Sequence, residues 1–99
     1  MTQRFTNKVM VVTGAAQGIG RRVAERAAAE GARVLIVDRS PARDDVVKAI
    51  RTAGGEAEAI EVDLETWTGC EAAMQKAVTL WGRIDILVNN VGGTIWAKP

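Results

Sequence analysis

Four short apolar runs alternate along the chain with three segments whose apolar residues recur at helical spacing. The apolar runs cover residues 8–13, 33–38, 56–62 and 84–89. Three of them are apolar on both faces and rich in β-branched residues, as expected of strands buried on both sides, whereas the run at 56–62 alternates. Strands that alternate with helices in this way predict a parallel sheet joined by right-handed crossovers.

The helical segments are predicted at residues 19–30, 40–53 and 66–81, with a glycine at or just after each C-terminal end. Ser40 followed by Pro41 predicts the start of the second helix, because the hydroxyl caps the backbone and proline suits the first turn. The residues expected on the buried faces of the second and third helices are Val46, Ala49, Ile50, Ala53, Cys70, Ala73, Met74, Ala77, Val78 and Trp81. We therefore predict an α/β fold, the first β-α-β-α-β-α-β part of a Rossmann-like doubly wound parallel sheet with strand order 3-2-1-4.

A glycine-rich turn joins the first apolar run to the first helix, with the sequence Thr13-Gly14-Ala15-Ala16-Gln17-Gly18-Ile19-Gly20. Gly14 lets the chain turn sharply, Gly18 lets the backbone approach a pyrophosphate, and Gly20 lets the helix pack closely on the sheet. The helix N-terminus then offers free N–H groups and a partial positive charge to the phosphates. A plain glycine-rich turn is the alternative, and the strand–turn–helix context favours dinucleotide binding.

Asp38 ends the second apolar run, roughly 20 residues after the glycine-rich turn. A carboxylate there can accept hydrogen bonds from both ribose hydroxyls of an adenosine and repels a 2′-phosphate, which favours NAD over NADP. Arg39 opposes this preference, since an adjacent guanidinium can bind a 2′-phosphate. The alternative is that Asp38 only begins the turn toward Ser40, with Arg39 in solvent.

Polar segments also follow the third and fourth apolar runs. After the third, the Asp63 carboxylate can accept a hydrogen bond from an adenine amino group while the Leu64 N–H pairs with a ring nitrogen; capping of the third helix is an alternative role for Asp63. After the fourth, Asn90 can tie neighbouring strand ends together, and Gly92 permits close approach of a cofactor ring. The run Asn-Asn-x-Gly is otherwise a turn signal.

Together these motifs resemble the short-chain dehydrogenase/reductase family over essentially the whole chain, with Val91 departing from the alanine usual in the family. The resemblance implies a cofactor site in which the glycine-rich turn meets the phosphates, Asp38 the ribose, the segment after the third run the adenine, and the segment after the fourth run the second ribose or the nicotinamide. The cofactor-binding residues expected from it are Gly14, Gln17, Gly18, Ile19, Asp38, Asp63, Leu64, Asn90 and Gly92.

The segment 90–99, with 14–22 and 37–40, is similar to members of the family that oxidise a cis-dihydroxycyclohexadiene carboxylate with NAD to a catechol, with loss of carbon dioxide. This resemblance implies that Gly93, Thr94 and Trp96 border the substrate pocket, although an aromatic that covers the sheet edge is an alternative reading of Trp96. Another family activity, such as reduction of a 3-oxoacyl carrier protein, and a non-catalytic dinucleotide-binding module are the alternative functions.

The 99 residues contain no tyrosine and no histidine. The hydride chemistry of the family depends on a serine and a Tyr-x-x-x-Lys pair, in which the phenol acts as general acid and base. Ser40 lies at the wrong place for that serine, so no catalytic residue is expected in this chain. We interpret residues 1–99 as the N-terminal portion of a single NAD-binding Rossmann domain, inactive alone, from a longer NAD-dependent dehydrogenase.

Composition excludes several other classes. The formal net charge of +1 argues against a nucleic-acid binder, and no apolar run approaches the roughly 18 residues that span a bilayer. A single cysteine, Cys70, and no histidine argue against a disulfide or metal site and favour a reducing cytoplasm. We expect a small-molecule substrate as the partner and, from the family resemblance, a homo-oligomeric parent enzyme.

Overall fold

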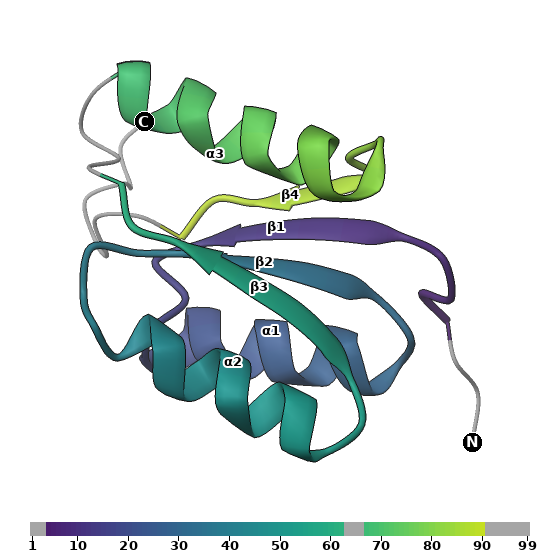
Figure 1. Ribbon diagram of the computed structural model, residues 1–99. Helices are drawn as coiled ribbons and strands as arrows, with labels where there is room; N and C mark the ends of the chain where they lie inside the picture. Colours follow the sequence, from purple (N-terminus) through teal and green to yellow (C-terminus); the bar gives the residue numbers. More distant parts are fainter. Residues whose placement is uncertain (1–3, 63–66, 91–99) are drawn as a thin grey trace.

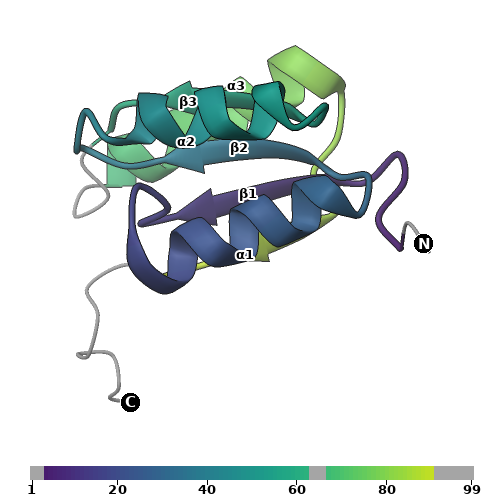
Figure 2. The ribbon, with the colours of Figure 1, turned by 90° about the horizontal axis from the view of Figure 1, so that it is seen from below.

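Four parallel strands form one sheet between two helical layers in the computed structural model of the protein, which describes residues 4–62 and 67–90 (Figure 1). The strands are β1 (Val9–Thr13), β2 (Arg33–Val37), β3 (Glu56–Ile60) and β4 (Ile86–Val88), and the helices are α1 (Gly18–Ala29), α2 (Arg43–Thr52) and α3 (Trp67–Trp81). Their order across the sheet is β3-β2-β1-β4, which confirms the predicted topology. Helices α1 and α2 lie side by side on one face (Figure 2), and α3 covers the other.

The two central strands form the core because both of their faces are covered. Successive strand residues point to opposite faces, so Val12 and Ile36 pack toward α1 and α2 while Val11 and Leu35 pack toward Ala73 on α3. All four of these strand residues are completely buried. The two-sided apolar runs of the sequence are therefore explained by helices on both faces.

Helix α2 begins at Arg43, and the predicted start at Ser40 is wrong by three residues. The Ser40 hydroxyl accepts a hydrogen bond from the Ala42 N–H at 3.1 Å, and the Arg43 N–H bonds back to the Ser40 carbonyl at 3.1 Å. These short-range bonds form a tight turn that contains Pro41 and precedes the helix. The serine–proline pair thus marks the turn into the helix rather than the first helical residues.

The edge strand β4 and the outer helix faces differ from the pattern expected of a fully buried sheet. Leu87 lies opposite Val11 in the register, yet it is 49% exposed, because β4 is the outermost described strand on its side of the sheet and is paired with β1 alone. Val78 of α3 and Ala53 after α2 were expected in the core and are exposed, whereas Val47 is buried.

Within the described ranges, no helix is long and apolar enough to cross a membrane.

Candidate dinucleotide-binding site

The candidate site lies at the carboxyl ends of β1, β2 and β4. The chain runs outward from β1 through β2 to β3 and then returns to the other side of β1 to form β4. In doubly wound sheets, the point where the strand order reverses leaves a crevice at the carboxyl ends of the strands, and ligands bind there. The glycine-rich turn, Asp38 and Asn90 all follow strands that end at this edge.

Two glycines of the turn are required by the packing of the protein itself. Gly14 has φ +62°, and a Cβ there would lie 2.1 Å from the carbonyl oxygen of Asn90. A Cβ on Gly20 would lie 2.3 Å from the Gly14 carbonyl oxygen, so α1 packs against the turn as closely as glycine allows. Gly20 therefore lets α1 approach the turn closely. The sequence had predicted that this glycine lets the helix pack closely on the sheet.

Gly18 differs from the other two because it faces open space. It has φ +65°, and nothing lies within 4 Å of the position that a Cβ would occupy. Helix α1 begins at this residue, and Gln17 precedes it in extended conformation without a capping hydrogen bond from its side chain. Gln17, Gly18 and Ile19 are exposed, with Ile19 at 73%. The open side of the turn thus coincides with the N-terminus of the helix, where backbone N–H groups favour an anion.

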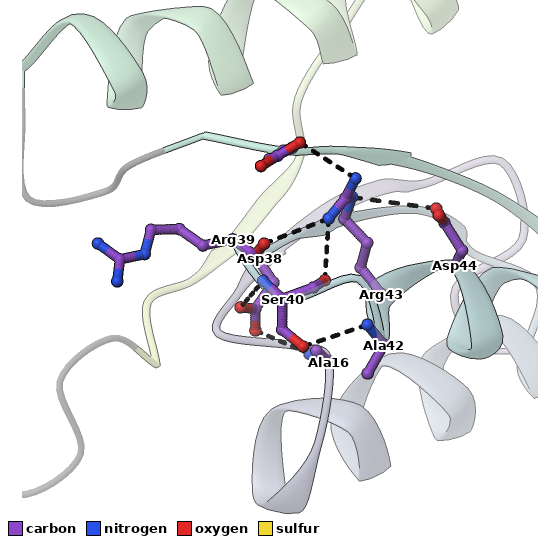
Figure 3. Close-up of polar contacts among 8 residues, drawn as sticks. Ala16, Asp38, Arg39, Ser40, Ala42, Arg43 and Asp44 are labelled. Atoms are coloured by element: carbon purple, nitrogen blue, oxygen red, sulfur yellow. Dashed lines mark hydrogen bonds and ion pairs between the residues drawn. The ribbon is translucent and has the colours of Figure 1, made fainter.

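The Asp38 carboxylate connects the end of β2 to the glycine-rich turn (Figure 3). Its Oδ2 accepts a hydrogen bond from the Ala16 N–H at 3.0 Å, and its Oδ1 accepts one from the Ser40 N–H at 3.0 Å. A backbone bond from the Gly14 N–H to the Val37 carbonyl, 2.9 Å long, also joins the turn to the end of β2. Asp38 does begin the turn toward Ser40, as the alternative reading held, and it also reaches the predicted phosphate-binding turn.

Thr13 and the two asparagines hold the other side of the turn. The buried Thr13 hydroxyl donates to Asn89 Oδ1 at 3.0 Å and accepts from the Asn90 N–H at 2.8 Å. Asn90 Nδ2 donates to the Gly14 carbonyl at 3.3 Å. Asn90 therefore ties β4 to the turn after β1, as predicted for it. The sequence reasoning assigned no role to Thr13, although a polar residue at the end of an apolar strand was the available signal.

Arg43 is a second residue of the site that the sequence reasoning missed. Its guanidinium donates to the carbonyl oxygens of Ser40 at 2.9 Å and Arg39 at 3.3 Å, and to Glu61 at 3.4 Å. The Arg43 side chain is 16% exposed. It thus fixes the turn after β2 and joins it to the segment after β3. The Arg39 side chain extends away from the other labelled residues in Figure 3.

Three of the predicted cofactor residues, Asp63, Leu64 and Gly92, lie outside the described residues, as do the substrate-pocket candidates at 93–96. The other six, Gly14, Gln17, Gly18, Ile19, Asp38 and Asn90, come together at one edge of the sheet. Their contact with a cofactor stays a prediction. Within residues 4–62 and 67–90, no three or more histidine, cysteine or acidic side chains are grouped to hold a metal ion.

Among the residues that the structure describes, the two acids with clearly lowered pKa values, Glu30 and Asp85, lie at the amino ends of the strands. Glu30 follows the C-terminal end of α1, and hydrogen bonds from Arg4 and Arg26 lower its pKa to about 2. A hydrogen bond from Arg83 and another from the Val9 N–H lower the pKa of Asp85, which precedes β4. Glu30 precedes β2 and Asp85 precedes β4, so both acids are remote from the candidate site at the carboxyl ends of the strands.

Comparisons with known proteins agree with this geometry. A family model described as short chain dehydrogenase matches residues 8–99. The chain is 53% identical over 98 residues to the 1,6-dihydroxycyclohexa-2,4-diene-1-carboxylate dehydrogenase of Acinetobacter baylyi, covering 99% of this chain and 38% of that protein. The chain therefore spans little more than a third of the length of this curated relative.

Solved structures share the fold at similar coverage. A hydroxysteroid dehydrogenase from Escherichia coli superimposes with a TM-score of 0.89 at 35% identity, over 98% of this chain and 43% of that one. A metagenomic short-chain oxidoreductase in complex with NADP superimposes with a TM-score of 0.83 at 38% identity, over 89% of this chain and 40% of that one.

Proposed function

The chain belongs to the short-chain dehydrogenase family, and from this premise we propose that it forms the cofactor-binding part of an NAD-dependent oxidoreductase. The observation that carries the proposal is the glycine-rich turn, whose first glycine is packed against Asn90 while Gly18 faces open space beside the N-terminus of α1. A turn of this shape suits a pyrophosphate, because backbone N–H groups and the helix dipole meet its charge.

In this proposal the segments that follow the four strands each contact one part of the cofactor. Gly14, Gln17, Gly18 and Ile19 approach the phosphates, and Asp38 accepts hydrogen bonds from the adenosine ribose. Asp63 and Leu64 contact the adenine, and Asn90 and Gly92 lie by the nicotinamide or its ribose. The half-buried Asp38 carboxylate retains acceptor capacity beyond its two backbone bonds, since each carboxylate oxygen has two lone pairs.

Preference for NAD over NADP is supported by the charges around Asp38. A 2′-phosphate would meet the carboxylate, and the nearby Arg43 guanidinium is already bonded to two carbonyl oxygens and to Glu61. Arg39 is the residue through which NADP would be accommodated, and a structural neighbour of 38% identity is described in complex with NADP. The proposal nevertheless favours NAD because a carboxylate at the ribose repels the additional phosphate.

For the substrate we propose a cis-dihydroxycyclohexadiene carboxylate, on the basis of the 53% identity to a dehydrogenase of that class. NAD held by these residues would supply the acceptor for a hydride from the ring carbon that bears the secondary hydroxyl, while the hydroxyl proton would go to a base. The resulting ring ketone is β to the carboxylate, so it would lose carbon dioxide, and the enolate left behind would take up a proton to give the catechol. The 99 residues hold no tyrosine, so we propose that the proton-accepting group comes from outside them.

The test is an assay of the full-length protein with NAD and the dihydroxy acid, in which NADH is followed by its near-ultraviolet absorbance. Formation of NADH together with catechol supports the proposal. NADPH oxidation with a 3-oxoacyl carrier protein substrate, and no reaction with the diol acid, would favour a different member of the family. Tight NAD binding without turnover of either substrate would favour a non-catalytic dinucleotide-binding module.

A further inference from the structure

The Asp38 carboxylate joins the end of β2 to the glycine-rich turn. Its two carboxylate oxygens accept hydrogen bonds from two backbone donors on different segments, the Ala16 N–H and the Ser40 N–H, each at 3.0 Å. Ala16 is only 1% exposed. A buried backbone N–H needs a partner, and at Ala16 that partner is a side chain.

The remaining bonds of the turn hold its beginning. The Gly14 N–H bonds to the Val37 carbonyl at 2.9 Å, and the Gly14 carbonyl accepts from Asn90 at 3.3 Å. The bond from Asp38 reaches Ala16, two residues beyond Gly14 and two residues before the open Gly18. Of the hydrogen bonds between described residues that join the turn to the end of another strand, it lies nearest to the part of the turn that would face the phosphates.

We propose that Asp38 is a positioning residue for the phosphate-binding turn, in addition to its role at the ribose. This rests on the proposed function, since it assigns a second task to the same site. The Asp38 carboxylate then takes part in binding both halves of the cofactor. It contacts the ribose directly, and it holds the turn that binds the pyrophosphate. A substitution of Asp38 then weakens binding of the phosphates even when the ribose lacks the hydroxyl groups that would bond to the carboxylate.

An Asp38→Asn substitution separates this role from a purely ribose-binding one. The amide keeps the shape of the carboxylate but has one acceptor oxygen and one N–H₂ donor group. Since both backbone partners are donors, either orientation of the amide sets its N–H₂ against the N–H of Ala16 or of Ser40. The matched control is Asp45→Asn, which removes the same charge from an exposed position in the first turn of α2.

Binding is measured by calorimetry on the full chain with NAD and with an NAD analogue whose adenosine ribose lacks both the 2′- and the 3′-hydroxyl. We expect Asp38→Asn to weaken binding of the dideoxy analogue about tenfold relative to Asp45→Asn, because an unpaired buried donor is costly. Equal affinity of the two variants for the dideoxy analogue would show that Asp38 acts through the ribose hydroxyls and would overturn the proposal.

A second measurement is independent of the cofactor, so the proposal stands or falls even if the chain does not bind NAD and the proposed function fails. Amide hydrogen exchange is followed by NMR at Ala16 and, as an internal reference, at Val11 in the centre of β1. We expect exchange at Ala16 to be at least about tenfold faster in Asp38→Asn than in Asp45→Asn, with Val11 unchanged. Unchanged exchange at Ala16, or equal acceleration at both amides, contradicts a local positioning role.

Discussion

Asn90 donates a side-chain hydrogen bond to the carbonyl oxygen of Gly14, and its own carbonyl oxygen lies 2.1 Å from the position that a Gly14 Cβ would occupy. The end of β4 is thus fitted against the turn after β1 with no room for a methyl group. Gly18, four residues later in the same turn, has a similar positive φ but no atom within 4 Å of its Cβ position. The two glycines are therefore constrained for different reasons.

We predict that Gly14→Ala destabilises the protein far more than Gly18→Ala. Both substitutions place a Cβ at positive φ, which costs about 1–3 kcal/mol. Only the first also forces backbone against backbone, so we expect it to lower the free energy of unfolding by more than about 3 kcal/mol, which is a large share of the stability of a small domain. Urea denaturation of both variants checks this, and equal losses would contradict the packing at Asn90.

Removal of the Thr13 hydroxyl is predicted to destabilise the sheet edge. A Thr13→Val substitution keeps the shape but leaves the Asn90 N–H without its 2.8 Å acceptor. We expect a loss of about 1–3 kcal/mol in the free energy of unfolding, the cost of an unsatisfied buried donor. The control is Thr79→Val, on an exposed face of α3, which is expected to change the stability by less than about 0.5 kcal/mol. A neutral Thr13→Val would mean that Asn90 finds another partner.

The charge of Glu30 is predicted to contribute to the acid limb of the stability profile. Arg4 and Arg26 lower its pKa from 4.5 to about 2 in the folded chain. A lowered folded-state pKa contributes stability that is present above the unfolded-state value and is lost as the pH falls through the folded-state value. We expect the urea midpoint of the native chain to fall between about pH 4.5 and 2.

The matched variants for this test are Glu30→Gln and Glu71→Gln, the second at an exposed position of α3. Glu30→Gln is expected to be less stable at neutral pH and to lose less of its stability on acidification over that range. Glu71→Gln should follow the native profile. If all three chains titrate alike, the ion pairs of Glu30 with Arg4 and Arg26 do not stabilise the fold.

Asp38→Ala is predicted to weaken NAD binding and to reduce the preference for NAD over NADP. The substitution removes the acceptor for the ribose and also the repulsion of a 2′-phosphate, so NADP affinity should fall less than NAD affinity. We expect about a tenfold loss for NAD, measured by titration of both cofactors. Unchanged NAD affinity would contradict the assignment of Asp38 to the ribose.

The central strands could be predicted because burial on both faces leaves continuous apolar runs in β1 and β2, and the strand order followed from the alternation of strands with helices. The start of α2 could not be predicted from Ser40 and Pro41 alone, since the same pair suits a tight turn that precedes a helix. Val78 fits the helical stripe of α3 yet is exposed, because periodicity specifies a face of the helix and not how far a neighbour covers it.

The part of the site carried by local motifs was also predictable, namely the glycine spacing and the acid after β2. Arg43 was not, because its role depends on carbonyl oxygens and on Glu61, eighteen residues further along the chain. The link from Asp38 to Ala16 likewise crosses between two strands. Sequence spacing identifies which residues can meet a ligand, whereas the bonds that orient them depend on tertiary structure.

The glycine-rich turn is local in sequence, but its shape depends on bonds to Asp38 and Asn90, which are 22 positions beyond Ala16 and 76 positions beyond Gly14. Such contacts form only after β2 and β4 have joined β1, and closing long loops is slow. The turn should therefore reach its final conformation late in folding, after the sheet has assembled. Cofactor affinity then depends on whether the sheet has fully assembled. A ligand that binds only the folded turn also stabilises strands that it does not contact.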